Sequence, residues 1–72
     1  MKSQIVKQFG INVRRLREKA ELTQEELAEK ADIHLNYVGY IERGVRNITL
    51  EKVVKIARVL KCKPSQIFQD LF

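Results

Sequence analysis

The apolar residues of this chain recur at intervals of three and four positions, which places side chains on one face of an α-helix. No segment alternates apolar and polar residues as a half-buried strand does. The first apolar stripe predicts a helix over residues 4–19. This stripe consists of Ile5, Phe9, Val13, Leu16 and Ala20. The pattern therefore predicts an all-α protein.

A capping box marks the start of a second helix. Thr23 is followed three residues later by Glu26, so a hydroxyl and a carboxylate can each accept a backbone N–H at the helix start. The helix is expected to begin at Gln24 and to end at Asp32, a residue type that tolerates left-handed geometry. Its inward residues are Leu27, Ala28 and Ala31.

Similar signals predict three further helices. A third is expected over residues 35–43 before Gly44, a fourth over residues 50–60 behind a Thr49 cap, and a short fifth from Pro64. The apolar residues that build them are Val38, Ile41, Leu50, Val53, Val54, Ala57, Leu60, Ile67 and Phe68. The predicted architecture is five short helices around one core, in a single domain over residues 1–72.

The second and third helices are expected to cross over a tight turn. Such a pair can brace its first helix against the phosphate backbone of DNA and lay its second in the major groove. Once Val38 and Ile41 face inward, the other side of the third helix is exposed. Its outward residues are Leu35, Asn36, Gly39, Tyr40 and Arg43. Residues 24–43 thus have the layout of a helix-turn-helix DNA reader.

The charges favour an anionic partner through their distribution. The net charge is +5, and residues 2–17 contain five bases and no acid. Residues 18–32 contain six acids against two bases, and residues 43–63 contain seven bases against one acid. Because an ordinary solvated surface can also carry signs in blocks, charge alone does not decide for nucleic acid.

The remaining composition argues against several other classes of protein. Cys62 is the sole cysteine, which excludes an intramolecular disulfide and favours a packing thiol over a reactive one. His34 is the sole histidine, so no histidine-cluster metal site or conventional triad is expected, and a capping role is favoured. The absence of a signal peptide or membrane span predicts a cytoplasmic protein. Neither enzymatic activity nor a cofactor is expected.

Three stretches carry a family resemblance: LTQEELA at residues 22–28, YVGYIERG at 37–44 and RNITL at 46–50. Together they resemble the Cro and phage-repressor class (XRE family) of helix-turn-helix regulators over residues 9–68. The run ERGVRNITL from residue 42 most resembles the controller proteins of restriction–modification systems. The resemblance implies a compact five-helix lambda-repressor-like domain. It also implies a homodimeric transcription regulator that binds double-stranded DNA at a near-palindromic operator.

The resemblance also implies roles for individual residues. Gln24 would fix the second helix to a phosphate, for which helix N-terminal N–H groups are suited, although a plain first-turn glutamine is the alternative. Arg17 would pair with Glu42 and tie the first helix to the recognition helix. Glu21 and Lys61 stand where the family often has glycine, at a cost of roughly 1 kcal/mol each if the backbone stays left-handed.

Side-chain chemistry separates expected base contacts from expected phosphate contacts. The Asn36 amide can pair with adenine and Leu35 can touch a thymine methyl, whereas Gly39 can let the DNA approach closely and favour readout of shape. The predicted base contacts are Leu35, Asn36, Gly39 and Tyr40, and the predicted phosphate contacts are Gln24, Tyr37, Arg43, Arg46 and Asn47. For Tyr37, a largely structural ring is an equal alternative.

Two surfaces are candidates for protein partners. The C-terminal residues 64–72 are more apolar than a short helix can bury, which predicts a homodimer contact, although the last two residues can instead be a frayed terminus. The residues of this contact are Ile67, Phe68, Leu71 and Phe72. An acidic face of Glu25, Glu26 and Glu29 is either solvated or a contact for RNA polymerase.

Two other functions stay open at this point. The chain can be an antitoxin that binds a toxin protein and autoregulates its operon. It can also be a helical interaction module that has lost DNA binding, which would show as no affinity for any duplex at low salt.

Overall fold

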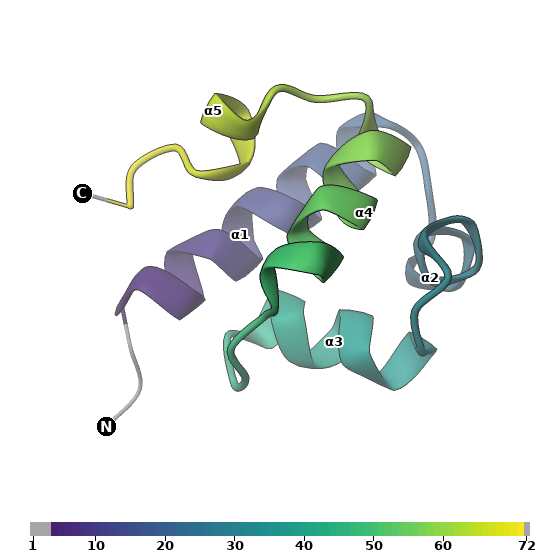
Figure 1. Cartoon of the computed structure of the whole chain (residues 1–72), viewed down its shortest axis with the longest axis horizontal. Helices are drawn as coiled ribbons and strands as arrows, with labels where there is room; N and C mark the ends of the chain where they lie inside the picture. Colours follow the sequence, from purple (N-terminus) through teal and green to yellow (C-terminus); the bar gives the residue numbers. More distant parts are fainter. Residues whose placement is uncertain (1–3, 72) are drawn as a thin grey trace.

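The computed structural model describes residues 4–71 and contains five α-helices in that part of the chain (Figure 1). They are α1 (Gln4–Lys19), α2 (Gln24–Ala31), α3 (Leu35–Arg43), α4 (Leu50–Leu60) and α5 (Pro64–Ile67). The predicted all-α class and the five helices are confirmed. None of the described helices is long and apolar enough to cross a membrane.

The third helix lies along one edge of the molecule, and α5 lies along the opposite edge (Figure 1). α3 packs against both α1 and α2, while α5 packs on α1. The axis of α2 points toward the viewer in Figure 1, so α2 crosses α3 steeply, as a helix-turn-helix requires. The surface expected to meet DNA is thereby separated from the C-terminal segment.

The core is built from apolar side chains of all five helices. Its buried residues are Phe9, Val13, Leu16, Leu27, Ala28, Ala31, Val38, Ile41, Val53, Ile56, Leu60 and Ile67. Several expected core residues are wrong. Ile5, Leu50 and Val54 are 53%, 77% and 41% exposed, and Ala20 is also exposed. In α4 the inward face runs through Val53, Ile56 and Leu60, which leaves Leu50 and Val54 on the surface.

The capping signals of the sequence act as expected. The Thr23 hydroxyl accepts the Glu26 backbone N–H at 3.0 Å, and the Glu26 carboxylate accepts the Thr23 N–H at 2.8 Å. The bond from the Thr23 backbone N–H lowers the pKa of Glu26, because it stabilises the ionised carboxylate. His34 Nδ1 accepts the backbone N–H of Asn36 at 3.1 Å, and the Thr49 hydroxyl caps α4.

Left-handed residues follow the ends of α2, α3 and α4 and also occur in the turn after α1. Asp32 and Gly44 have φ values of 56° and 69°, as the sequence predicts. Glu21 and Lys61, where the resembling family often has glycine, keep the same geometry with φ values of 60° and 52°. A side chain at a left-handed position costs roughly 1 kcal/mol relative to glycine, and aspartate, as at Asp32, tolerates this geometry better than glutamate or lysine.

A buried asparagine fastens the C-terminal segment to α1. Asn12 is fully buried, and its amide nitrogen donates to the carbonyl oxygens of Ile67 at 3.0 Å and Gln69 at 2.7 Å. Its side-chain oxygen accepts a hydrogen bond from Gln8 at 3.1 Å. The amide thus satisfies carbonyl groups at the end of α5 that no helical partner can reach.

The backbones of α1 and α3 are in direct contact at Gly10. A Cβ atom on Gly10 would overlap the carbonyl oxygen of Ile41 and lie 2.9 Å from that of Glu42. A Cβ atom on Gly44 would lie 2.7 Å from the Cα atom of Lys7. The glycine inside α1, unfavourable for a helix by propensity, is therefore required by the close approach of α3.

We expect Gly10→Ala to lower the free energy of unfolding by about 1–3 kcal/mol, because the new methyl group meets backbone atoms that cannot move aside. Urea unfolding at one protein concentration measures the change. Gly39→Ala is the matched control, since its Cβ atom would meet only the flexible end of the Arg43 side chain at 3.0 Å. This control should be as stable as the parent or more so. Equal stability of the two variants would contradict the backbone contact.

Candidate nucleic-acid interface

The N-terminus of α2 and the outer face of α3 enclose a shallow groove. It is lined by Thr23, Gln24, Glu25, Leu35, Asn36, Gly39, Tyr40 and Arg43. All four predicted base contacts are therefore brought together, along with Gln24 and Arg43 from the predicted phosphate contacts. Tyr37, Arg46 and Asn47 lie outside this lining. The groove is the candidate interface.

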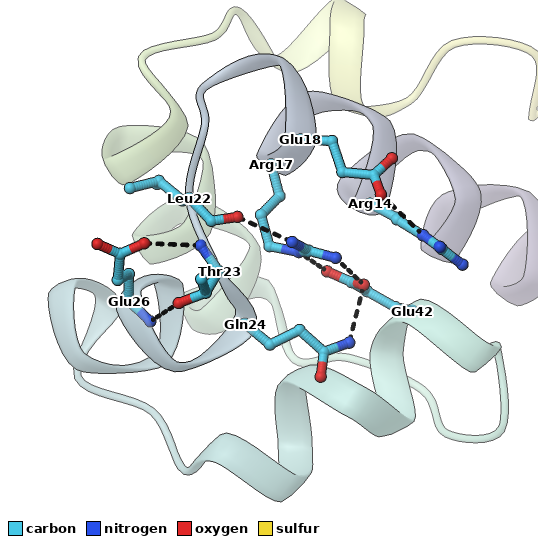
Figure 2. Close-up of polar contacts among 8 residues, drawn as sticks. All are labelled: Arg14, Arg17, Glu18, Leu22, Thr23, Gln24, Glu26 and Glu42. Atoms are coloured by element: carbon cyan, nitrogen blue, oxygen red, sulfur yellow. Dashed lines mark hydrogen bonds and ion pairs between the residues drawn. The ribbon is translucent and has the colours of Figure 1, made fainter.

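The carboxylate of Glu42 joins three helices beneath the groove (Figure 2). One oxygen accepts from Arg17 Nε at 2.6 Å, and the other accepts from Arg17 Nη2 and from Gln24 Nε2, each at 3.0 Å. The side chains of Arg17 and Glu42 are 11% and 3% exposed. Because the hydrogen bond to Glu42 favours the charged guanidinium, it raises the pKa of Arg17.

The buried polar atoms of this ion pair all have hydrogen-bond partners among the described residues. Arg17 Nη1 donates to the carbonyl oxygen of Leu22 at 2.8 Å, which also holds the chain between α1 and α2 (Figure 2). No buried side-chain nitrogen or oxygen of residues 4–71 lacks a hydrogen-bond partner. A buried pair with this geometry fixes the relative orientation of the helices that carry it.

The side chain of Gln24 can bond the Glu42 carboxylate and a group in the groove at the same time. Its amide nitrogen carries two hydrogens, and one of them is used by Glu42. The second hydrogen remains for a group in the groove that Gln24 lines. The residue is therefore more than a plain first-turn glutamine, because it connects the groove directly to the buried carboxylate.

The recognition helix presents fewer open positions than the sequence predicts. Leu35 is 40% exposed and Asn36 is also exposed. Gly39 is buried instead, because the guanidinium of Arg43 lies over it, with Nη1 3.0 Å from where a Cβ atom would stand. The expectation that Gly39 leaves an open approach to the helix backbone is corrected for the free protein.

Two arginines share the ring of Tyr40. The Cζ atoms of Arg43 and Arg46 lie 5.3 Å and 4.6 Å from its ring centroid, within the range of cation–π attraction. The sequence analysis assigned these three residues separately and missed the cluster. Arg46 lies in the loop after α3, and the left-handed turn at Gly44 is what lets the chain fold back toward Tyr40.

Tyr37 is engaged within the protein. Its hydroxyl donates to the carbonyl oxygen of Asn47 at 3.0 Å, and Lys52 Nζ lies 4.9 Å from its ring centroid. The ring packs against the core. Of the two roles considered for Tyr37, the free structure therefore contains the structural one, in which the residue holds the loop between α3 and α4.

The proposed C-terminal contact needs correction. Ile67 is fully buried within its own protomer and so cannot supply surface to a partner. Phe68 is 37% exposed, with its ring centroid 5.7 Å from that of Phe9, and Leu71 is partly buried against the core. Phe72 lies outside the described residues. Three of the exposed apolar side chains, Leu50, Val54 and Phe68, line one apolar groove of α4, α5 and the turn between them.

The remaining candidates for chemistry are the Cys62 thiol, any metal-binding group and the acidic residues of α2. Burial raises the pKa of the Cys62 thiol, which disfavours the reactive thiolate. Within residues 4–71, no three histidine, cysteine, aspartate or glutamate side chains are grouped to hold a metal ion. The three acidic residues of the outer face of α2, Glu25, Glu26 and Glu29, are all exposed, and Glu26 also forms the capping box.

Removing the buried carboxylate should be costly. We expect Glu42→Ala to lower the free energy of unfolding by about 3 kcal/mol, because it leaves the Arg17 guanidinium buried without its counter-charge. Urea unfolding at fixed protein concentration measures this. The control is Glu18→Ala, which breaks the exposed Arg14–Glu18 pair and should cost less than about 1 kcal/mol. Similar losses in both variants would contradict a structural role for the buried pair.

Comparisons with known proteins agree with this geometry. A family model described as helix-turn-helix matches residues 13–67. The chain is 40% identical over 60 residues to control protein C.BamHI of Bacillus amyloliquefaciens, which covers 82% of this chain and 74% of that protein.

Two solved structures extend the likeness to three dimensions. The restriction–modification controller protein C.AhdI of Aeromonas hydrophila is 38% identical with a TM-score of 0.85, covering 88% of this chain and 96% of that one. C.Esp1396I bound to a 25 base pair operator site is 28% identical with a TM-score of 0.84, covering 96% of this chain and 91% of that one. The chain therefore belongs to the XRE-type helix-turn-helix family of DNA-binding transcription regulators, in which these relatives are restriction–modification controller proteins.

Proposed function

We propose that this protein is a controller-type transcription regulator that acts in the cytoplasm and binds an operator in double-stranded DNA as a homodimer. The observation that carries the proposal is the groove of α2 and α3, held in place by the buried Glu42 carboxylate before any DNA is bound. The operator complex of C.Esp1396I supports the same use of this fold. The antitoxin alternative receives no support from the relatives named above, which are controller proteins.

Base recognition in this proposal centres on the first turn of α3. Asn36 is exposed in the groove, and its amide can donate to and accept from the major-groove edge of adenine. Leu35 lies beside it and suits a thymine methyl group. Tyr40, one turn further along the helix, suits a methyl or sugar contact. This leaves Asn36 as the principal reader in that turn.

Phosphate contacts in this proposal flank the groove on both sides. Gln24 and the N-terminus of α2 would hold one phosphate, because the first N–H groups of a helix are free to bind an anion. Arg46 and Asn47 in the loop after α3 would hold phosphates further along the strand. Tyr37 contributes by fixing the backbone of Asn47 through its hydroxyl.

The dimer contact is proposed for the exposed apolar side of α4 and α5. Leu50, Val54 and Phe68 supply apolar side chains there, next to an apolar groove lined by the same two helices and the turn between them. A two-fold axis through this surface would place two α3 helices on half-sites about 34 Å apart, which requires a near-palindromic operator.

Contact with RNA polymerase is a further proposal for the outer face of α2. Glu25, Glu26 and Glu29 are exposed there, and Glu26 also forms the capping box with Thr23. All three carboxylates are therefore at the surface. The charge of Glu29 would repel phosphates, so its side of α2 must point away from DNA, whereas Glu25 lies at the edge between this face and the groove that it also lines.

DNA binding should depend strongly on salt, because phosphate contacts release counterions from the duplex. A duplex is first selected from a random pool at a stated salt concentration, and its affinity is then measured by fluorescence anisotropy across a salt series. We expect the logarithm of the affinity to fall linearly with the logarithm of salt concentration. A flat dependence, or no binding at low salt, would contradict the proposed function.

Asn36→Ala should weaken binding to the selected duplex by about 1–3 kcal/mol and relax the preference at one base position. Affinities for single-position variants of the duplex at matched salt measure both effects. Glu29→Gln, on the exposed outer side of α2, is the control and should retain parental affinity. Unchanged preference in Asn36→Ala would remove Asn36 as a reader, and weaker binding by Glu29→Gln would mean that the helix pair is oriented differently.

The dimer contact can be broken without disturbing the core. Val54→Glu places a charge on a side chain that is already 41% exposed, so the protomer should fold while the apolar contact is lost. Sedimentation at micromolar concentration should show a dimer for the parent and a monomer for this variant. Ile11→Glu, at a 54% exposed position of α1, should remain dimeric. A monomeric parent or a dimeric Val54→Glu would contradict the proposed surface.

A further inference from the structure

The backbone of Arg43 lies in the last turn of α3, but its charged guanidinium lies beside the middle of the helix. Its guanidinium lies over Gly39, with Nη1, Cζ and Nη2 at 3.0, 3.8 and 3.9 Å from the position of a Cβ atom there. Long side chains in helices lean toward the N-terminus of the helix. At residue 39 the missing side chain leaves the space that the guanidinium occupies.

Arg43 lines the groove of α2 and α3, which is the proposed DNA-binding surface. Arg43 lines it together with Asn36 and Tyr40, and it is the sole basic residue of that lining. Arg46 contacts the same tyrosine ring from the loop but does not line the groove. The two arginines are therefore placed for different tasks, although they share one ring.

We propose that Arg43 reads a guanine base of the operator, with Gly39 as the positioning residue that admits its side chain to the groove. This inference rests on the proposed function and replaces the phosphate contact expected for Arg43 from the sequence. A guanidinium can donate two parallel hydrogen bonds to the O6 and N7 atoms of guanine in the major groove. If Arg43 contacted a phosphate, its side chain would not need to lie along the middle of the helix.

The position of the guanidinium also predicts where the guanine stands. Residues 36 and 39 are separated by about 4.5 Å along a helix axis, which is little more than the rise of one base pair. The guanine should therefore lie one or two base pairs from the adenine assigned to Asn36. Leu35 offers no hydrogen-bonding group in the same turn, so Arg43 supplies the second polar contact of each half-site.

The test uses the full chain and the duplex selected by the parent protein. Affinities are measured at one salt concentration for that duplex, for variants in which each G·C pair is replaced in turn, and for an unrelated duplex. The proteins are the parent, Arg43→Lys, Gly39→Ala and, as the control, Arg46→Lys. Arg43→Lys retains the charge but loses the two parallel donors. Gly39→Ala retains the arginine but shifts its guanidinium by a few tenths of an ångström, because the new Cβ atom would stand 3.0 Å from Nη1.

We expect the parent to discriminate about tenfold to hundredfold against replacement of one G·C pair in each half-site. Arg43→Lys should lose most of this discrimination and Gly39→Ala part of it, while their affinity for the unrelated duplex changes less than about threefold. Arg46→Lys should keep the discrimination. Urea unfolding of Gly39→Ala confirms that the fold is intact.

The inference is overturned if Arg43→Lys discriminates among the G·C variants as the parent does. It is also overturned if the selected half-site has no guanine within two base pairs of the position that Asn36→Ala relaxes. A parent protein that selects no duplex at all would instead contradict the proposed function, which keeps the two failures distinguishable.

Discussion

The buried carboxylate of Glu42 is the constraint on which the arrangement of the DNA-reading helices depends. It accepts hydrogen bonds from Arg17 of α1 and Gln24 of α2, and it is carried by the last turn of α3. A carboxylate this deeply buried is tolerated only if its partners stay in place, since an unpaired buried charge is very costly. The angle between α2 and α3 is therefore set by the folded protein itself. Binding that uses a preformed groove spends little free energy on ordering the protein.

Three glycines allow this arrangement, each for a different reason. Gly10 permits backbone contact between α1 and α3, and Gly44 takes the left-handed conformation that turns the chain toward α4. Gly39 gives its space to the guanidinium of Arg43. The first two act on the fold and the third on the chemistry of the groove, so the same residue type has separate consequences for stability and for recognition.

The sequence predicted what depends on local structure and missed what depends on packing. Helix ends follow from short-range signals such as Thr23 with Glu26, and these were confirmed in the structure. In α4, apolar residues occupy two adjacent faces, so periodicity could not show that Ile56 is buried while Leu50 and Val54 are exposed. The pairing of Arg17 with Glu42 came from family resemblance alone, because nothing local links residues 25 positions apart. The bonds of Asn12 and the placement of Arg43 over Gly39 likewise require knowledge of neighbours in space.

The central claim is that one preformed face of α2 and α3 meets DNA while the rest of the protomer keeps its structure. Backbone amide chemical shifts, recorded by NMR with and without the selected duplex, test it most directly. The account predicts large changes at the N-terminus of α2, along residues 35–43 and in the loop at residues 45–47. It predicts small changes in α5 and around Asn12. Shifts concentrated on the outer face of α2 or on α5, with α3 unaffected, would contradict the account.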